Sequence, residues 1–214
     1  MRLISINVGL PAEHAYGDQR IVTGGYKQPV AAARLYTRGL VGDGQADLVN
    51  HGSPDQAVLT FAFDYYPYWQ DRLGRDLAPG AFSENLTVEG ATETDICVGD
   101  IFRVGEAVIQ ATQPRQPCSK LARKLGEPRL VDWIVEARQG GVYFRVLTEG
   151  AVAADSAFEL VEAHPDRISI ATISDIIYDR VHDRALIQYL AEMPEFAAGG
   201  RARFAQKLER LGQG

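Results

Sequence analysis

Cysteine and histidine are scarce in this sequence, and long apolar runs are absent. The 214 residues include 2 cysteines and 4 histidines, which are too few for a disulfide framework and show no short zinc-binding spacing. No apolar run approaches the roughly 18 residues that cross a membrane, and the N-terminus lacks the apolar core of a signal peptide. We therefore expect a cytoplasmic protein with no membrane partner, in which thiols stay reduced.

Excess positive charge and the common nucleotide-binding motifs are missing as well. The formal net charge is -6, whereas a nucleic-acid binder must neutralise phosphates, so no nucleic-acid polymer is expected as a partner. The sequence contains no P-loop, no Gly-x-Gly-x-x-Gly turn and no Gly-x-Ser-x-Gly elbow. Hydrophobic residues make up 46%, which is enough for a sizeable core without a metal or disulfide.

Short alternating or apolar segments, separated by glycine-containing turns, predict a mainly β protein. The first nine residues alternate as a half-buried strand does. Further strands are expected at 34–37, 57–63, 85–88, 101–104, 107–112, 142–148 and 158–161. Many short strands separated by such turns predict a closed or nearly closed β-barrel.

Helical patterns interrupt the strands and then close the chain. Inserted helices are expected at 64–73 and 119–139, the second broken near Gly126 and Pro128. Three short helices are expected at 172–179, 183–192 and 195–211. We therefore predict a barrel domain over residues 1–164 and a small three-helix unit over residues 165–214, with a boundary near His164.

The segment around Cys118 carries the strongest chemical signature. Two prolines hold a rigid loop after a strand, and Cys118 follows at a predicted helix start, between Arg115 and Lys120. Helix-start N–H groups and nearby cations favour a thiolate, which suits a soft metal centre or nucleophilic attack. The alternative is a buried, inert cysteine; we favour that interpretation for Cys97, which has apolar neighbours.

Two more polar segments stand directly before apolar strands, at expected mouths of the barrel. His51 lies in a turn near Asp47 and Asp55, where it could orient a partner, donate a proton or bind a metal. The simpler interpretation is a histidine that only satisfies hydrogen bonds. Glu84 and Asn85 precede the next strand, and for them the alternative is a turn-capping pair.

These three segments, in this order, resemble the MOSC domain, which is named for the C-terminal domain of molybdenum cofactor sulfurase. The Gln-Pro-Arg-x-Pro-Cys segment over residues 113–118 is the most specific, and residues 50–52 and 84–86 add independent support. The helical end resembles the three-helix appendage of a stand-alone bacterial subgroup, which includes the N-hydroxylaminopurine resistance proteins. The resemblance thus covers nearly the whole chain.

The resemblance implies a barrel that binds the molybdenum cofactor, molybdopterin, with Cys118 as the metal ligand. The other positions that match the family's motifs around the cofactor pocket are Lys27, Asp47, His51, Glu84, Asn85 and Arg115. Lys27 and Arg115 are expected to offset the phosphate charge, and Asn85 to bond the pterin edge. His51 or Glu84 is then the candidate proton donor.

The activity implied is that of a molybdenum-dependent oxidoreductase that reduces small N-hydroxylated compounds, including hydroxylaminopurine bases, as a detoxification. A flavin-type reductase would supply electrons. Two alternatives stay open: a non-catalytic carrier of cofactor or sulfur that uses Cys118, and a barrel that has lost its cofactor and binds a small ligand.

Three residues depart from the family pattern. Ser53 and Ser83 stand where glycine is usual, which suggests that those turns do not demand a positive φ. Gln56 stands where lysine is usual, and this change leaves the substrate preference open.

Overall fold

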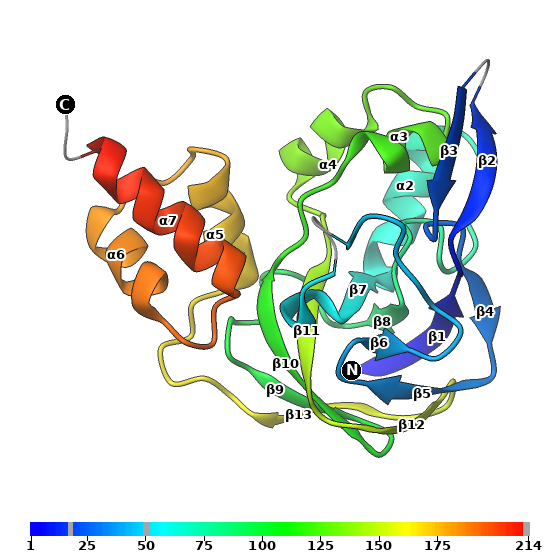
Figure 1. Cartoon of the computed structure of the whole chain (residues 1–214), viewed down its shortest axis with the longest axis horizontal. Helices are drawn as coiled ribbons and strands as arrows, with labels where there is room; N and C mark the ends of the chain where they lie inside the picture. The colour runs from blue at the N-terminus through cyan, green and yellow to red at the C-terminus, as the bar shows by residue number, and fades with distance from the viewer. Residues whose placement is uncertain (17–18, 49–51, 212–214) are drawn as a thin grey trace.

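The computed structural model describes residues 1–16, 19–48 and 52–211, and strands predominate over helices in its larger part (Figure 1). The largest sheet has the strand order β13-β9-β10-β11-β7-β8-β1-β4. Its strands in chain order are β1 (Arg2–Val8), β4 (Gln28–Val30), β7 (Val58–Ala62), β8 (Leu86–Glu89), β9 (Ile101–Val104), β10 (Ala107–Pro114), β11 (Val142–Thr148) and β13 (Phe158–Glu162). The pairs are antiparallel except β7 with β8, which run parallel.

This sheet curls toward closure without a continuous ladder across the gap. Its terminal strands are β13 and β4, and no pairing joins these two within the described ranges. An isolated antiparallel bridge between Arg2 and Ala157 nevertheless brings the start of β1 against the residue before β13. The expectation of a mainly β protein with several helices is confirmed, and full closure of the barrel stays a prediction.

Two smaller sheets complete the β structure. One contains β5 (Ala32–Tyr36), β6 (Gly39–Leu40) and β12 (Gly150–Ala153). The other is a hairpin of β2 (Ala12–Tyr16) and β3 (Gln19–Thr23). The sequence did not predict β2, β3, β4, β6 or β12. The hairpin strands contain no fully buried residue, so they lack the apolar alternation by which a half-buried strand is recognised.

The inserted helices enclose an aromatic core of their own. They are α2 (Tyr66–Leu73), α3 (Ser119–Lys124) and α4 (Leu130–Ala137), with two 3-10 turns, η1 (Pro54–Gln56) and η2 (Phe63–Tyr65). The rings of Phe61 and Phe82 stack at 4.2 Å, with Tyr66 and Trp69 buried against them. Leu121 and Ala122 of α3 are buried in the same cluster, so this packing fixes the position of α3.

Three helices close the chain as predicted: α5 (Ile170–Ile177), α6 (Arg184–Glu192) and α7 (Ala198–Leu211). The sequence placed the first start at Thr172, but Ser169 is the cap, because its Oγ accepts from the Thr172 N–H at 3.1 Å. Ile170, Ile173 and Ile176 are buried in the same cluster as the sheet residues. The appendage therefore shares a core with the sheet, while its status as a separate domain stays a prediction.

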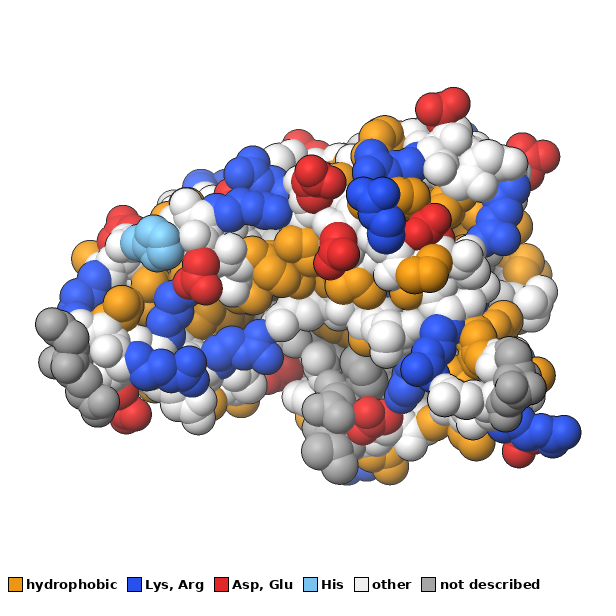
Figure 2. Space-filling view, turned by 90° about the horizontal axis from the view of Figure 1, so that it is seen from above, with side chains coloured by type: hydrophobic (Ala, Val, Ile, Leu, Met, Phe, Trp, Pro, Cys, Tyr) orange, Lys and Arg blue, Asp and Glu red, His pale blue; other side chains and the backbone are white. Residues whose placement is uncertain are grey.

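The helices of the described residues are short relative to a bilayer. None of them is long and apolar enough to cross a membrane. Figure 2 shows lysine and arginine side chains spread over the C-terminal helices, as expected for solvated helix faces.

Candidate functional site

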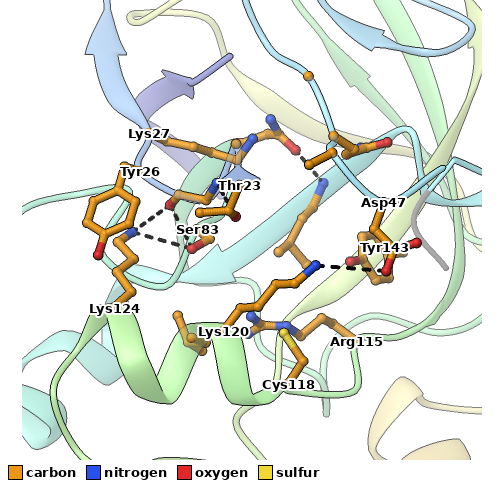
Figure 3. A pocket seen from close by; sticks show the side chains of 18 residues that line it. Thr23, Tyr26, Lys27, Asp47, Ser83, Arg115, Cys118, Lys120, Lys124 and Tyr143 are labelled. Atoms are coloured by element: carbon orange, nitrogen blue, oxygen red, sulfur yellow. Dashed lines mark hydrogen bonds and ion pairs between the residues drawn. The ribbon is translucent and has the colours of Figure 1, made fainter. Parts of the chain in front are cut away.

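A pocket opens beside the loop that joins β10 to α3, and Cys118 lines it (Figure 3). Segments far apart in the sequence form its wall: the strand-rich N-terminal region, the turn before β8, the Cys118 loop with α3, and β11. The empty space is about 800 Å³, including the open mouth, which suits a cofactor-sized ligand. Its lining side chains include Thr23, Tyr26, Lys27, Asp47, Ser83, Asn85, Arg115, Cys118, Lys120, Lys124 and Tyr143.

The backbone around Cys118 holds its side chain at the pocket wall. β10 ends at Pro114, and the next residue is fixed by an N–H donated from Arg115 to the Gly141 carbonyl at 2.9 Å. Cys118 then has an extended backbone, with φ -122° and ψ 164°, at the cap position of α3. Its carbonyl accepts from the Leu121 N–H at 3.0 Å. The thiol is thus half-buried, as a ligand that must be both shielded and accessible should be.

Arg115 is a buried cation without an acidic partner. Its side chain donates from Nη1 to the Gly140 carbonyl at 3.3 Å, and the residue is only 7% exposed. No carboxylate lies within ion-pair distance of it in the part of the chain that the structure describes. Burying an uncompensated charge is costly, so an anion in the pocket would stabilise this arrangement.

Lys124 adds a second cation that sequence reasoning did not single out. Its Nζ donates to the carbonyls of Gly25 at 2.8 Å and Gly80 at 2.7 Å, and to Ser83 Oγ at 3.3 Å. Burial lowers the pKa of Lys124 to about 8, and the nearby Glu84 carboxyl opposes that shift. The spacing of Lys120 and Lys124 on the predicted helix that follows Cys118 could have revealed it, since residues four apart share a face.

Lys27 belongs to a buried polar network behind the pocket wall. Its Nζ forms an ion pair with Asp43, and the two side chains are 7% and 3% exposed. Burial lowers the pKa of Lys27, with Asp43 opposing the shift. Lys27 was expected to clamp a phosphate, but Asp43 already neutralises its charge. Arg115 and Lys124 are therefore the stronger candidates for anion contact, and Asp43 is a site residue that the sequence analysis missed.

Asn85 makes its hydrogen bonds to the protein. Its Oδ1 accepts from the Leu59 N–H at 3.1 Å, and its Nδ2 donates to Asp43 at 2.8 Å and to the Asn7 carbonyl at 3.4 Å. With both donors directed at protein oxygens, Asn85 holds Asp43 in place. Its expected contact with a pterin edge stays a prediction, and the second lone pair of Oδ1 is the part of the amide left to make it.

Glu84 is fully buried and does not line the pocket. One carboxyl oxygen accepts from the Tyr66 hydroxyl at 2.5 Å, the Gly80 N–H at 2.8 Å and the Thr87 hydroxyl at 2.7 Å. The other oxygen, Oε2, has no hydrogen-bond partner among the described residues. This position favours a structural and electrostatic role behind Lys27 and Lys124, whose pKa values the carboxyl raises. Its role as a proton donor stays a prediction.

The remaining candidates divide between the pocket and the core. Asp47 lines the pocket and pairs with Lys120 at 3.8 Å, while His51 lies outside the described residues. Cys97 is 3% exposed, so its expected burial is confirmed, and burial raises the pKa of its thiol. The sequence did not indicate Tyr143 as a site residue. It faces Arg115 and Cys118, and burial raises the pKa of its hydroxyl.

Only one of the two Gly-to-Ser departures behaves as expected. Ser53 has φ -70°, whereas Ser83 has φ 64°, so the turn at Ser83 does require the left-handed region. The expectation was wrong because side-chain hydrogen bonds hold this residue there: its hydroxyl donates to the Gly25 carbonyl at 2.8 Å and accepts from Lys124. These bonds offset the cost of a non-glycine residue at positive φ.

The donor set fits a phosphate-bearing cofactor with a soft metal better than a bare metal ion. No group of three or more His, Cys, Asp or Glu side chains within the described ranges could hold a metal. The pocket instead offers the thiol of Cys118 beside Arg115 and Lys124, neither of which has an ion-pair partner in the described part of the chain. A thiolate is a ligand for soft metals, and the cations suit a phosphate.

Comparisons with known proteins agree with this geometry. The family model described as "MOSC domain" matches residues 47–159. YflK of Bacillus subtilis (strain 168) is 41% identical over 98% of this chain and 95% of its own length. A protein of Gibberella moniliformis named "Reductase" is 28% identical over 90% of this chain, but only 35% of that longer protein is covered. The crystal structure of YiiM from Geobacillus stearothermophilus is similar with a TM-score of 0.82 and 35% identity, covering 97% of this chain and 98% of YiiM.

Proposed function

Because the chain belongs to the MOSC domain family, we propose that it binds the molybdenum cofactor and reduces small N-hydroxylated compounds. MOSC domains are associated with this cofactor. The observation that carries the proposal is the placement of the Cys118 thiol beside the buried, unpaired Arg115 in one pocket. The name of the fungal relative, "Reductase", supports the class of reaction.

In this proposal the chain's own residues bind and shield the cofactor. The Sγ of Cys118 is the protein ligand to the metal, and Arg115 and Lys124 offset the phosphate charge. Lys27, Asp43 and the amide of Asn85 keep the wall rigid, because each is committed to a buried partner. When bound, the cofactor would supply a two-electron redox centre for cleavage of the N–O bond.

The reaction consumes two electrons and two protons per turnover. The N–O bond of the substrate breaks, the nitrogen leaves as an amine, and the oxygen leaves as water. A flavin-type reductase is the proposed electron donor. His51 and Glu84 stay the candidate proton sources. Among the described residues, the Lys120–Asp47 pair lines the same pocket as Cys118, whereas Glu84 does not.

Turnover with an artificial reductant tests this function directly. Molybdenum-loaded protein is mixed with hydroxylaminopurine and reduced viologen, and formation of the amine is followed. We expect turnover by the wild type and its loss in Cys118→Ser, while Cys97→Ser keeps it. If the loaded wild type shows no turnover and Cys118 carries a persulfide, the enzyme hypothesis is rejected in favour of a carrier of cofactor or sulfur.

A further inference from the structure

A buried glutamate, Glu93, lies behind the loop that leads to Cys118. It belongs to the segment between β8 and β9, and it is 3% exposed. It lines a small cavity of about 240 Å³, including the opening, and it does not line the pocket beside Cys118. Arg115 lines both the cavity and the pocket, so it forms part of the wall between them.

Each oxygen of the Glu93 carboxyl accepts one hydrogen bond. Oε1 accepts from the Gly141 N–H at 2.6 Å, and Oε2 accepts from the Tyr65 hydroxyl at 2.7 Å. Burying a carboxyl is costly unless hydrogen bonds replace those made to water. The two donors therefore fix the carboxyl, and the carboxyl in turn satisfies the buried N–H of Gly141.

The two glycines before β11 hold Arg115 by its backbone and by its side chain. The Arg115 N–H donates to the Gly141 carbonyl at 2.9 Å, and Nη1 donates to the Gly140 carbonyl at 3.3 Å. A Cβ added at Gly140 would lie 2.6 Å from the Arg115 carbonyl oxygen. At Gly141 φ is +94°, and an added Cβ would lie 2.5 Å from the Thr60 carbonyl oxygen. Because these approaches are so close, a shift of this turn would move Arg115.

The two hydrogen bonds of Glu93 lead to different parts of the molecule. Through Gly141 the carboxyl is connected to Arg115 and so to the pocket wall. Through Tyr65 it is connected to η2 and to the aromatic core of the inserted helices, and Tyr65 does not line the pocket. Substitutions can therefore separate the effect of this carboxyl on the pocket from its effect on packing.

From these contacts we infer that Glu93 is a positioning residue for the anion site of the pocket. By holding Gly141, it places the guanidinium of Arg115 where an anion bound beside Cys118 can contact it. Glu93 itself does not touch that anion, because it lies outside the pocket. The inference rests on the proposed function, since it takes the cofactor phosphate to be the anion.

Pyrophosphate binding by the cofactor-free full chain, followed by calorimetry, tests the inference. Glu93→Asp shortens the side chain by one methylene group and draws the acceptor away from Gly141, so we expect the Kd for pyrophosphate to rise about fivefold or more. Glu93→Gln keeps an oxygen that can accept from Gly141, and it should keep most of the wild-type affinity. Tyr65→Phe is the matched control. It removes the other bond to the same carboxyl, so stability should fall while the Kd stays that of the wild type.

A double-mutant cycle shows whether Glu93 acts through Arg115. Arg115→Met alone should weaken pyrophosphate binding, and Glu93→Asp should add little in that background. A general loss of packing would instead weaken binding equally in both backgrounds. Wild-type affinity in folded Glu93→Asp, or equal losses with and without Arg115, overturns the inference.

The results also separate this inference from the proposed function. If Glu93→Asp weakens pyrophosphate binding but the wild type carries no molybdenum from a molybdenum-competent host, the cofactor is rejected and Glu93 stays the positioning residue of an anion site. If the wild type carries molybdenum but Glu93→Asp binds pyrophosphate normally, the proposed function stands and the inference fails. No pyrophosphate binding by the wild type rejects the anion site and the inference together.

Discussion

At the scale of single residues, the pocket holds more positive charge than the protein neutralises. Arg115 and Lys124 have no ion-pair partner among the described residues, whereas Lys27 is committed to Asp43. The sequence did not show which of these cations are paired inside the protein and which are available to a ligand, because a motif contains the same residue type in both cases. Burial lowers the pKa of Lys124 to about 8, and this makes its contribution measurable.

Anion binding should weaken as the pH rises through about 8, because Lys124 then loses its proton. Pyrophosphate, a probe for the cofactor phosphate, should bind the wild type more weakly near pH 9 than near pH 7 when followed by calorimetry. Lys124→Met should bind pyrophosphate more weakly than the wild type at both pH values, and it should lose most of the pH dependence. If pyrophosphate affinity fell equally with pH in both proteins, the pH dependence would belong to a group other than Lys124.

The free energy of unfolding has the opposite pH dependence to that of anion binding. The pKa of Lys124 is lower in the folded state, so between about 8 and its ordinary value of 10.5 the unfolded chain binds more protons. The free energy of unfolding therefore rises with pH across that window, and below it the charged lysine destabilises the fold. A bound anion would compensate for this cost, since it favours the charged form.

At the scale of elements, a single carboxylate ties three of them together. Asp55 of η1 pairs with Arg145 of β11 at 3.0 Å, and it accepts the Ala198 N–H at the first turn of α7 at 2.8 Å. Arg145 also donates to the Glu195 carbonyl at 3.0 Å, just before α7. This junction fixes α7 against the sheet.

Removing that carboxylate should loosen the junction. Asp55→Ala leaves Arg145 without its acid and the first turn of α7 without a cap, so we expect a loss of about 2–4 kcal/mol in the free energy of unfolding by urea. Glu13→Ala is the matched control. Glu13 pairs with Arg20 across the hairpin, but its side chain is 53% exposed, so little change is expected. Equal losses in both variants would show that Asp55 does not act as a junction.

At the scale of the whole molecule, the sequence predicts what local pattern determines and misses what depends on distant contacts. The strands β7 to β11 were predicted because their apolar runs are buried. The hairpin of β2 and β3 was not, because no residue in it is fully buried. In the pocket, the motif identified Cys118 and Arg115. The position of Lys124 depends on a hydrogen bond to the Gly25 carbonyl, 99 residues away in the sequence, which no local motif contains.

The same limit applies to the C-terminal helices. Their existence follows from their periodicity, but their contribution to the central core depends on tertiary packing. Phe196 and Phe204, which are 0% and 1% exposed, pack at 5.1 Å in a tilted pair. No local pattern indicates which surface such a pair covers.

The central claim is that Cys118 binds the metal of a molybdenum cofactor, and metal content tests it most directly. Wild type, Cys118→Ser and Cys97→Ser are purified from a molybdenum-competent host, checked for folding by circular dichroism, and analysed for molybdenum and releasable pterin. The account predicts molybdenum in the wild type and in Cys97→Ser, and loss of most of it in folded Cys118→Ser. Equal molybdenum in all three proteins, or none in the wild type, would contradict it.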